Sequence, residues 1–540
     1  MNTRCYSFRQ IPQTTRLFND FLYDFPKVSQ FYSRSPHFRD WMASEAEAAS
    51  TRYDSTRRDR VATALEAQNR AWGASEKTLE NLRRFRAGAD AAVSGQQVGL
   101  FGGPLYSLFK ALTAVRMAEE ATAAGIECVP VFWLATEDHD LAEVNHATLL
   151  GTNGAPQRLT AATTGKTGAP MSEMLLGAEI TAVVESMAGL VGDQDVVAAV
   201  RDAYRPGETL ASAFAKLYTR LFAPWGLILL DPADAALHEI ARPVFRTAVE
   251  KAAEIGSGLL DRGQQLVKAG YHEQVKVTAT STLLFAIRNG VRIPVHQLSR
   301  NGATVFEIGK EKISPDEMLK LVEADSANLN ANVLLRPVMQ DYLLPTIAYA
   351  GGPAEIAYFA QIGVVQQAIL NRVTPIIPRF SATLVEAKSA SLLDRHHLAL
   401  EDLFQGEENL RNVFAARSLP QALTAAFASA ERAIGAALAQ VRDGLSKLDP
   451  TLVEAEQRAE SKIRYQIHRL QQRATREEAR RNEVISRHAA ALSNVLYPKK
   501  SLQERGLGGI SFLGRNGLDL LPRVLENIHT DCVDHQALYL

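Results

Sequence analysis

The segment from Ala91 to Leu134 constrains the fold of this chain more than any other. A short apolar run ends in Ser94-Gly95-Gln96-Gln97, and Gly102-Gly103-Pro104 then precede a stretch with apolar residues at helical spacing. Pro104 suits the first position of a helix, where its missing N–H costs nothing. The run Cys128–Leu134 follows and is typical of a buried strand. Strand, glycine-rich loop, helix and strand in this order predict a βαβ unit with a parallel sheet.

Three later segments extend this sheet. Trp225–Leu230 and Leu343–Ala350 have the composition of buried strands, and 374–377 is a shorter candidate. The second of them is followed by Gly351-Gly352-Pro353 and an apolar helix over 354–370, which repeats the strand, glycine and helix order. We therefore expect an α/β fold with a Rossmann-like, doubly wound parallel core assembled from distant segments.

Two segments depart from this pattern. Residues 280–310 predict an antiparallel meander with a first turn at Asn289-Gly290 and a second at 299–302. Residues 386–497 are rich in Ala, Glu, Arg and Gln, with apolar residues close to a heptad spacing, which predicts an α-helical coiled-coil arm. We expect a core at 1–385 with insertions at about 150–220 and 270–335, the arm at 386–497, and a segment 498–540 that returns to the core.

Charge and cysteine content exclude several classes of protein. The 59 basic and 60 acidic residues leave a formal charge of -1, which argues against a general nucleic-acid binder. The three cysteines are far apart and form no CxxC pair, which fits a reducing compartment. No apolar run approaches the length of a membrane span, and the N-terminal residues do not have the pattern of a signal peptide. We expect a cytoplasmic protein that binds neither nucleic acid nor membrane.

The first cluster of candidate site residues lies in the βαβ unit. A glycine-rich turn before a helix lets backbone N–H groups approach an anion. The amides of the cluster can donate and accept hydrogen bonds, and Tyr106 and Lys110, four residues apart, share one face of the helix. Glycines in such a turn are also often purely structural, so both readings stay open. The candidates are Gly95, Gln96, Gln97, Gly102, Gly103, Tyr106 and Lys110.

The second cluster follows the strand that ends at Leu134. Glu137, Asp138 and His139 come first, and Asn145 and His146 follow. Ligands bind beyond the carboxyl ends of strands in open α/β sheets, so these polar residues are site candidates. The alternative is a solvated loop that caps the next helix. A metal site is disfavoured because the spacing is not HExxH and thiols are absent, so no bound metal is predicted.

The third cluster flanks the strand predicted at 343–350. A guanidinium such as that of Arg336 can bind a carboxylate through two hydrogen bonds. The second glycine loop can hold a polar group at a helix start, where Glu355 also has a simpler explanation as a favourable partner of the helix dipole. The candidates are Arg336, Gln340, Asp341, Gly351, Gly352, Glu355 and Tyr358.

Together the three clusters resemble the bacillithiol synthase family, the cysteine ligases of bacillithiol biosynthesis. The matching strings are SGQQVGLFGGPLYSLFKA from Ser94, VFWLATEDHDLAEVNH from Val131 and RPVMQDYLLPTIAYAGGPAEIAYFAQ from Arg336. Weaker matches are AGYHEQV from Ala269 and LQERGLGGISFLGRNGLDLL near the C-terminus. The resemblance spans nearly the whole chain, with the motifs in the expected order.

The resemblance implies a core related to class I aminoacyl-tRNA synthetases, inserted connecting subdomains and a homodimer formed through the coiled coil. It implies condensation of L-cysteine with glucosaminyl malate, with Mg²⁺-ATP activating the cysteine carboxylate. The amine must lose a proton, which makes Glu137, Asp138 or His139 a candidate base. Tyr106, Lys110 and Arg336 are candidates for binding an anion or a carboxylate.

Two other functions remain open. One is a ligase or nucleotidyltransferase that acts on another substrate. The other is a non-catalytic dimeric scaffold with a coiled coil and a relic nucleotide-binding core. The concentration of polar residues at the ends of strands argues against the scaffold, because a relic site has no reason to keep them.

Overall fold

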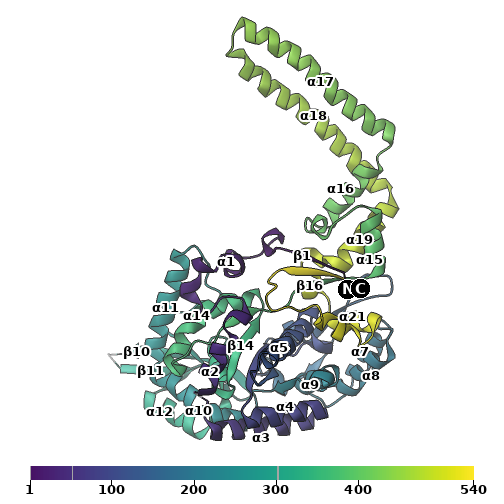
Figure 1. Cartoon of the computed structure of the whole chain (residues 1–540). Helices are drawn as coiled ribbons and strands as arrows, with labels where there is room; N and C mark the ends of the chain where they lie inside the picture. The colour runs from purple at the N-terminus through teal and green to yellow at the C-terminus, as the bar shows by residue number, and fades with distance from the viewer. Residues whose placement is uncertain (1, 52, 301–302) are drawn as a thin grey trace. The chain divides into compact units, whose positions relative to one another are not determined.

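Five strands form one parallel sheet at the centre of the computed structural model, which describes residues 2–51, 53–300 and 303–540 (Figure 1). Their order is β15-β14-β2-β3-β8, and each neighbouring pair is parallel. Counted along the chain this is the order 3-2-1-4-5 of the doubly wound Rossmann fold, with its switch point between β2 and β14. The predicted core is confirmed, and its relation to the synthetases stays a prediction. The strands are β2 (Asp90–Gln96), β3 (Cys128–Leu134), β8 (Ile228–Leu230), β14 (Thr346–Gly351) and β15 (Ile376–Pro378).

Burial explains why these short segments become strands. Every residue of β3 and β14 is buried, as expected for a parallel sheet covered on both faces. Helices α2 (Met42–Thr51) and α5 (Leu105–Ala123) share one apolar cluster with β2, β3 and β14. Helices α3 (Ser55–Ala71) and α4 (Glu76–Ala87) contact β8.

Three strands begin later than predicted, and one of them, expected at 374–377, is β15 at Ile376–Pro378. The strand expected from Leu343 begins at Thr346, because the residues before it belong to helix α13 (Arg336–Leu343) and Leu344 N–H closes that helix on Gln340 O at 2.8 Å. The strand expected from Trp225 begins at Ile228, after Gly226 turns the chain with a φ of 65°.

Two insertions interrupt the core between its strands. The first, between β3 and β8, contains the hairpin β4–β5 (His146–Leu150 and Pro156–Thr160) and helices α7 (Ile180–Ala188), α8 (Gln194–Ala203) and α9 (Leu210–Leu221). The second, between β8 and β14, contains helices α10 (Ala235–Glu250), α11 (Ala252–Lys268) and α12 (Pro315–Ala324) and a five-stranded antiparallel sheet. The strands of this sheet, in the order β12-β11-β10-β9-β13, are β9 (Ser281–Arg288), β10 (Val291–Arg300), β11 (Ala303–Ile308), β12 (Glu311–Ile313) and β13 (Leu329–Ala331).

The predicted meander lies within that antiparallel sheet. Asn289 and Gly290 have φ values of 56° and 74°, as an Asn-Gly hairpin turn requires. Residues 301–302 of the second predicted turn lie outside the described residues.

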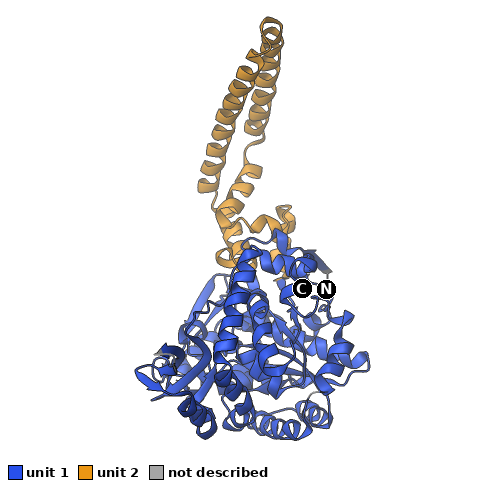
Figure 2. Cartoon of the chain, turned by 90° about the vertical axis from the view of Figure 1, so that its left-hand side faces the viewer, with its two compact units in different colours: residues 1–383, 503–538 blue, residues 384–502, 539–540 orange. Residues whose placement is uncertain are grey.

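The chain separates into two compact units, coloured blue and orange in Figure 2. Unit 1 comprises residues 1–383 and 503–538, so the C-terminal segment belongs with the core. It includes α14 (Pro353–Leu370), α20 (Gln503–Gly506), α21 (Gly509–Asn516) and α22 (Leu520–Leu525). It also includes β1 (Asn2–Tyr6), the start of β16 (Ala382–Val385) and most of β17 (His535–Tyr539), which form a small sheet with the strand order β1-β17-β16.

Unit 2 comprises residues 384–502 and 539–540 and is helical. Helices α17 and α18 form a long antiparallel hairpin, which confirms the predicted coiled-coil arm. Asn482 ends α18 and caps α19 by accepting from Ile485 N–H. No helix in the described part of the chain combines the length and apolarity of a membrane span. The helices are α15 (Ala387–Arg395), α16 (Glu407–Ser418), α17 (Gln421–Leu448), α18 (Leu452–Arg481) and α19 (Glu483–Leu496).

Candidate active site

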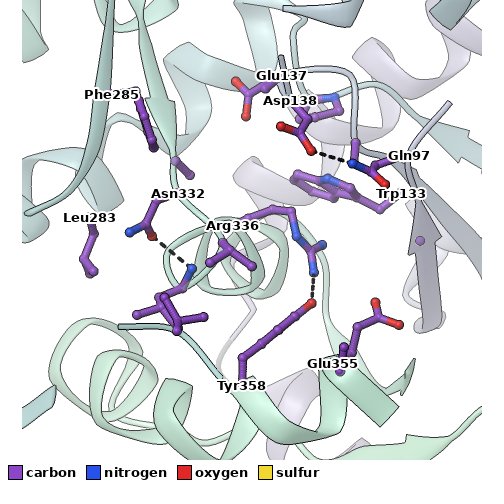
Figure 3. A pocket seen from close by; sticks show the side chains of 18 of the residues that line it. Gln97, Trp133, Glu137, Asp138, Leu283, Phe285, Asn332, Arg336, Glu355 and Tyr358 are labelled. Atoms are coloured by element: carbon purple, nitrogen blue, oxygen red, sulfur yellow. Dashed lines mark hydrogen bonds between the residues drawn. The ribbon is translucent and has the colours of Figure 1, made fainter. Parts of the chain in front are cut away.

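A cavity of about 650 Å³ opens beyond the carboxyl ends of β2, β3 and β14, at the switch point of the sheet (Figure 3). This is the place where doubly wound folds bind ligands. Six basic and three acidic side chains line it, which suits a ligand with anionic groups. The basic residues are Lys110, Lys276, Arg292, Arg336, Arg379 and Arg505, and the acidic ones are Glu137, Asp138 and Glu355.

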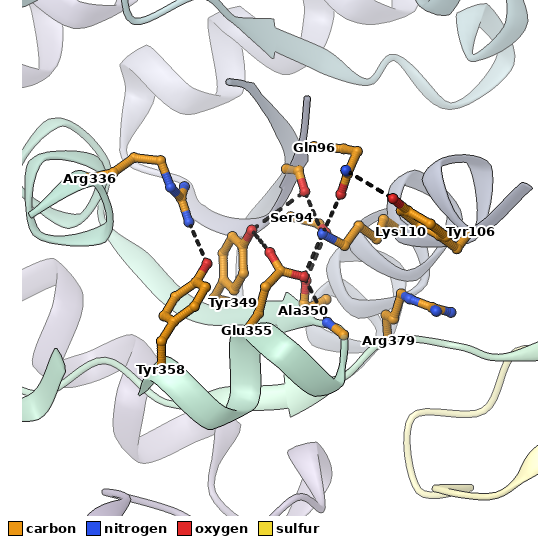
Figure 4. A network of polar contacts seen from close by, with 12 residues as sticks. Ser94, Gln96, Tyr106, Lys110, Arg336, Tyr349, Ala350, Glu355, Tyr358 and Arg379 are labelled. Atoms are coloured by element: carbon orange, nitrogen blue, oxygen red, sulfur yellow. Dashed lines mark hydrogen bonds and ion pairs between the residues drawn. The ribbon is translucent and has the colours of Figure 1, made fainter. Parts of the chain in front are cut away.

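A buried ion pair joins α5 and α14, the helices that follow the two strands at the switch point (Figure 4). Lys110 Nζ lies 2.5 Å from Glu355 Oε2 and also donates to Gly95 O and Gln96 Oε1, both at 2.8 Å. Burial lowers the pKa of Lys110 to about 8, and Glu355 opposes that shift. All three ammonium protons have acceptors within the protein. Lys110 therefore holds the end of β2 against the start of α14 and has no proton left for a ligand.

Both carboxylate oxygens of Glu355 also accept hydrogen bonds. Its Oε2 accepts the N–H of Gly352 at 2.7 Å, which caps α14, and its Oε1 accepts the hydroxyl of Tyr349 at 2.6 Å. Burial would raise the pKa of Glu355, but Lys110 and the Gly352 N–H bring it below its ordinary value. The cap explains why an acidic residue stands in the first turn of this helix.

Arg336 is a half-buried cation that lines the cavity. Its Nη2 donates to Tyr358 Oη at 3.1 Å, and its guanidinium lies 5.9 Å from the ring of Trp133 and 5.5 Å from that of Tyr349. Among the described residues no carboxylate lies within 4.0 Å of it. An unpaired guanidinium against aromatic rings is suited to bind a carboxylate or a phosphate.

A second arginine reaches the cavity after the last core strand. Arg379 lies 5.2 Å from the ring centre of Tyr106 and pairs with Glu504 Oε1 at 2.6 Å. Glu504 is buried and comes from the C-terminal segment, so that segment fixes one wall of the cavity. Arg505 beside it is exposed.

Two carboxylates form an acidic end of the cavity. Glu137 Oε1 accepts from His238 Nε2 and from Asn330 Nδ2, both at 2.7 Å. Asp138 accepts from Gln97 Nε2 at 2.8 Å, as Figure 3 shows. Arg292, from the inserted sheet, lies 3.8 Å from Asp138.

Eleven of the predicted site residues line this one cavity. They come from the ends of three strands and from the helices that follow, which is why the sheet brings them together. They are Gly95, Gln96, Gln97, Tyr106, Lys110, Glu137, Asp138, Arg336, Gly352, Glu355 and Tyr358.

Gly102 and Gly103 do not line the cavity, and their loop does not offer its N–H groups to it. Gly102 N–H donates to Gly99 O at 3.1 Å and to the hydroxyl of Tyr204 at 3.2 Å, and Gly103 N–H donates to Leu100 O. Both glycines have positive φ, 87° and 75°. Glycine adopts positive φ without strain, so the backbone geometry alone accounts for glycine at both positions.

Six other candidates lie beside or behind the cavity wall. His139 is exposed and contacts Arg292, while Asn145 and His146 begin the first insertion. Gln340 and Asp341 are buried behind the wall, where Asp341 accepts from both Gln340 and Gln366. Gly351 is buried at the end of β14, where a Cβ would lie 2.7 Å from Ile376 Cδ1.

Several cavity residues were absent from the sequence prediction. Arg379 and Arg505 could have been predicted from the sequence. Arg379 follows a predicted strand, and Arg505 lies in the C-terminal string LQERGLGG. Others reach the cavity through the insertion and through strand pairing. Among them are Lys276, Trp133, Arg292, Asn332 and Tyr349, with His238 directly behind Glu137.

The donor set fits anionic ligands better than a protein-bound metal. Arg336 and Arg505 have no ion pair within the described residues, and both face the cavity. Nowhere in residues 2–51, 53–300 and 303–540 do three or more His, Cys, Asp or Glu side chains come together as metal ligands would.

Two family models together match almost the whole chain. Residues 1–380 match the model described as bacillithiol biosynthesis BshC, N-terminal Rossmann-like domain. Residues 382–540 match the one described as bacillithiol biosynthesis BshC, C-terminal coiled-coil domain.

Curated relatives of similar length carry one common name, "Putative cysteine ligase BshC". A protein of Koribacter versatilis is 49% identical over 534 residues, covering 99% of both chains. One of Solibacter usitatus is 36% identical over 538 residues, covering 100% of both. One of Salinibacter ruber is 32% identical over 532 residues, covering 97% of this chain and 96% of the relative.

Proposed function

The chain belongs to the BshC family of bacillithiol biosynthesis, and on that premise we propose that it is a cysteine ligase that joins L-cysteine to the amine of glucosaminyl malate. The observation that carries the proposal is the cavity at the switch point of the sheet. It has a half-buried guanidinium, Arg336, with no ion pair among the described residues, and a separate pair of carboxylates, Glu137 and Asp138. These are the groups needed to hold a carboxyl donor and an amine in one site.

Arg336 would bind the cysteine carboxylate. Its aromatic surroundings and its hydrogen bond to Tyr358 fix the plane of the guanidinium before a ligand arrives. Such preorganisation lowers the entropy cost of binding. Tyr106 and Gln96, which hydrogen-bond to each other at 3.2 Å, add neutral donors on the adjacent wall.

The acidic end of the cavity would receive the amine. A carboxylate binds an ammonium group and can accept the proton that the nitrogen loses as the new C–N bond forms. Glu137 and Asp138 line the cavity, whereas His139 is exposed beside it. The base is therefore proposed among the two carboxylates.

ATP would supply the activation that amide formation requires, by converting a carboxylate oxygen into a leaving group. The excess of basic side chains in the cavity supports a polyanionic cosubstrate. Mg²⁺ would enter with the phosphates, because divalent magnesium keeps several waters and binds substrate phosphates readily.

We also propose a homodimer formed by unit 2. The hairpin of α17 and α18 exposes apolar side chains that a single chain leaves uncovered. They are Leu423, Val441, Leu448, Ile463, Tyr465 and Leu470.

A mass-spectrometric assay tests the function directly. Purified protein is incubated with L-cysteine, glucosaminyl malate and Mg²⁺-ATP, and ATP is omitted in parallel. Cysteinyl product that forms only with ATP supports the proposal. Product without ATP would contradict the ATP dependence, and no product from a folded, dimeric sample would contradict the ligase assignment.

A further inference from the structure

His238 lies directly behind the acidic end of the cavity, on helix α10, and is almost fully buried. Its Nδ1 faces the carbonyl oxygen of Ser326 at 3.0 Å, and its Nε2 lies 2.7 Å from Glu137 Oε1. A carbonyl oxygen only accepts hydrogen bonds, so Nδ1 carries a proton. The ring also stacks on Phe245, with centroids 5.5 Å apart and planes 6° apart, so its orientation is fixed.

The proton between His238 and Glu137 has only two possible positions. It lies on Nε2, giving an imidazolium beside a carboxylate, or on Glu137, giving two neutral groups. Glu137 Oε1 also accepts from Asn330 Nδ2 at 2.7 Å, and a carboxylate is the better acceptor of two such bonds. Burial would lower the pKa of His238, but the charge and hydrogen bond of Glu137 raise it above its ordinary value.

The other charged groups around this pair leave it short of positive charge. Asp138 lies on the same loop, Arg292 reaches in from β10, and Asp231 follows β8. Burial raises the pKa of Asp231 to about 6, so it is ionised at neutral pH. His238 and Arg292 are the cations beside Glu137 and Asp138, and Glu143 shares the amide of Gln97 with Asp138, so carboxylates are in excess at this end of the cavity.

We propose that His238 is a positioning residue that keeps Glu137 ionised, and that Glu137 and Asp138 form the subsite for the protonated reacting amine of the amino sugar. The inference rests on the proposed function for the identity of that amine. Glu137 Oε1 is occupied by His238 and Asn330, so Oε2 is the oxygen left for the ligand. An ammonium group there would supply the missing positive charge.

The positive charge of His238 keeps the carboxyl group of Glu137 in its ionised form. A carboxyl group taken out of water prefers its neutral form unless a cation compensates it. A neutral Glu137 would neither attract an ammonium group nor accept its proton. Loss of the imidazolium should therefore weaken binding of the amine most at low pH and least at high pH.

Two substitutions separate charge from hydrogen bonding. His238→Gln places an amide N–H near the position of Nε2, so it keeps a bond to Glu137 without the charge. His238→Asn places its amide near Nδ1 and keeps the bond to Ser326. Glu137→Gln is the matched variant that removes the carboxylate itself while preserving its size.

The measurement is binding of glucosaminyl malate by calorimetry between pH 5.5 and 8.5, with glucosyl malate, which lacks the nitrogen, as the matched ligand. The wild-type protein should bind glucosaminyl malate at least about tenfold more tightly than glucosyl malate, which is the affinity change equivalent to a pKa change of about one. His238→Gln and His238→Asn should lose that preference at pH 5.5 and regain most of it at pH 8.5. Glu137→Gln should lack it at every pH.

Each result bears on one claim. An unchanged preference in both His238 variants, or a loss that is equal at all pH values, would overturn the role of His238. No preference in the wild-type protein would overturn the ammonium subsite. If the wild-type protein binds neither sugar, the proposed function fails instead, and binding of L-cysteine in the same samples shows whether the site is intact.

Discussion

Lys110 shows how burial decides what a charged residue can do. Its position on the first core helix favours a role in anion binding, yet its three protons are held by Gly95, Gln96 and Glu355. It connects β2 with α14 across the switch point, whereas Arg336 makes no ion pair among the described residues and can bind a ligand. Two basic residues in one cavity thus have different roles because only one of them has a carboxylate partner.

Lys110→Met should destabilise unit 1 by about 3–5 kcal/mol, because it leaves the charge of Glu355 buried without its partner. Lys110→Met combined with Glu355→Gln should recover part of that loss. Urea unfolding of the wild type, both single variants and the double variant gives the coupling energy. Strict additivity would show that the pair does not interact.

Arg336→Lys should raise the KM for L-cysteine by about ten- to a hundredfold, because lysine keeps the charge but loses the two-pronged guanidinium, worth about 1.5–3 kcal/mol for a charged hydrogen bond. Arg60→Lys is the matched control, since Arg60 is an exposed arginine paired with Glu239. Steady-state kinetics with each substrate varied in turn would test this. A rise in the KM of glucosaminyl malate alone would place the carboxylate of cysteine elsewhere.

The stability conferred by His238 should depend on pH in a defined direction. Its pKa is raised in the folded protein, so its contribution is full below pH about 6.5, its ordinary pKa, and is lost as pH rises through the raised value. The wild type should therefore exceed His238→Gln in free energy of unfolding by more at pH 6 than at pH 8.5. Groups such as Asp231 are present in both proteins, so their contributions to the pH dependence cancel when the two free energies of unfolding are subtracted. A gap that is constant with pH would mean that His238 is neutral.

At the scale of elements, the sequence predicted what depends on local order and missed what depends on distant partners. The carboxyl ends of parallel strands meet at one edge, so residues such as Gln96, Glu137 and Glu355 could be placed together in advance. The loop of Gly102 and Gly103 could not be assigned, because Tyr204 and Leu507, far away in the chain, take N–H groups there. His238 could not be predicted from the sequence, since it lies in the first turn of an amphipathic helix and meets Glu137 only after folding.

Gly95 allows β2 to pack closely against β3 at the edge of the cavity. A Cβ on it would lie 2.7 Å from Trp133 O and 2.8 Å from Trp133 Cβ, atoms of the adjacent strand that have little freedom to move. Gly95→Ala should therefore separate β2 from β3, cost about 1–3 kcal/mol and reduce kcat/KM strongly. Gly256→Ala is the control, because that glycine lies in α11 with open space around it and should gain up to about 1 kcal/mol. Thermal unfolding with the product assay would show the contrast, and equal behaviour of both variants would contradict it.

At the scale of the whole molecule, the two units differ in what they leave exposed. Unit 1 buries its apolar strands and keeps the cavity as its main polar interior. The hairpin of unit 2 has no buried residue on α17. On α18, Ile463, Ile467 and Leu470 lie four and three residues apart and so share one face, as a coiled-coil seam requires. Ile463 and Leu470 are exposed on this face, so it can accept a partner helix.

Ile463→Glu combined with Leu470→Glu should therefore convert a dimer into a monomer without loss of helix content, because the two exposed side chains lie one heptad apart on the seam. Val267→Glu is the matched control, since Val267 is equally exposed but lies on α11 in unit 1. Light scattering after size-exclusion chromatography gives the mass of each protein. The wild type and the control should have twice the 59.1 kDa mass of the chain. A monomeric wild type would contradict the dimer itself, and a dimeric double variant would place the interface away from this face of the hairpin.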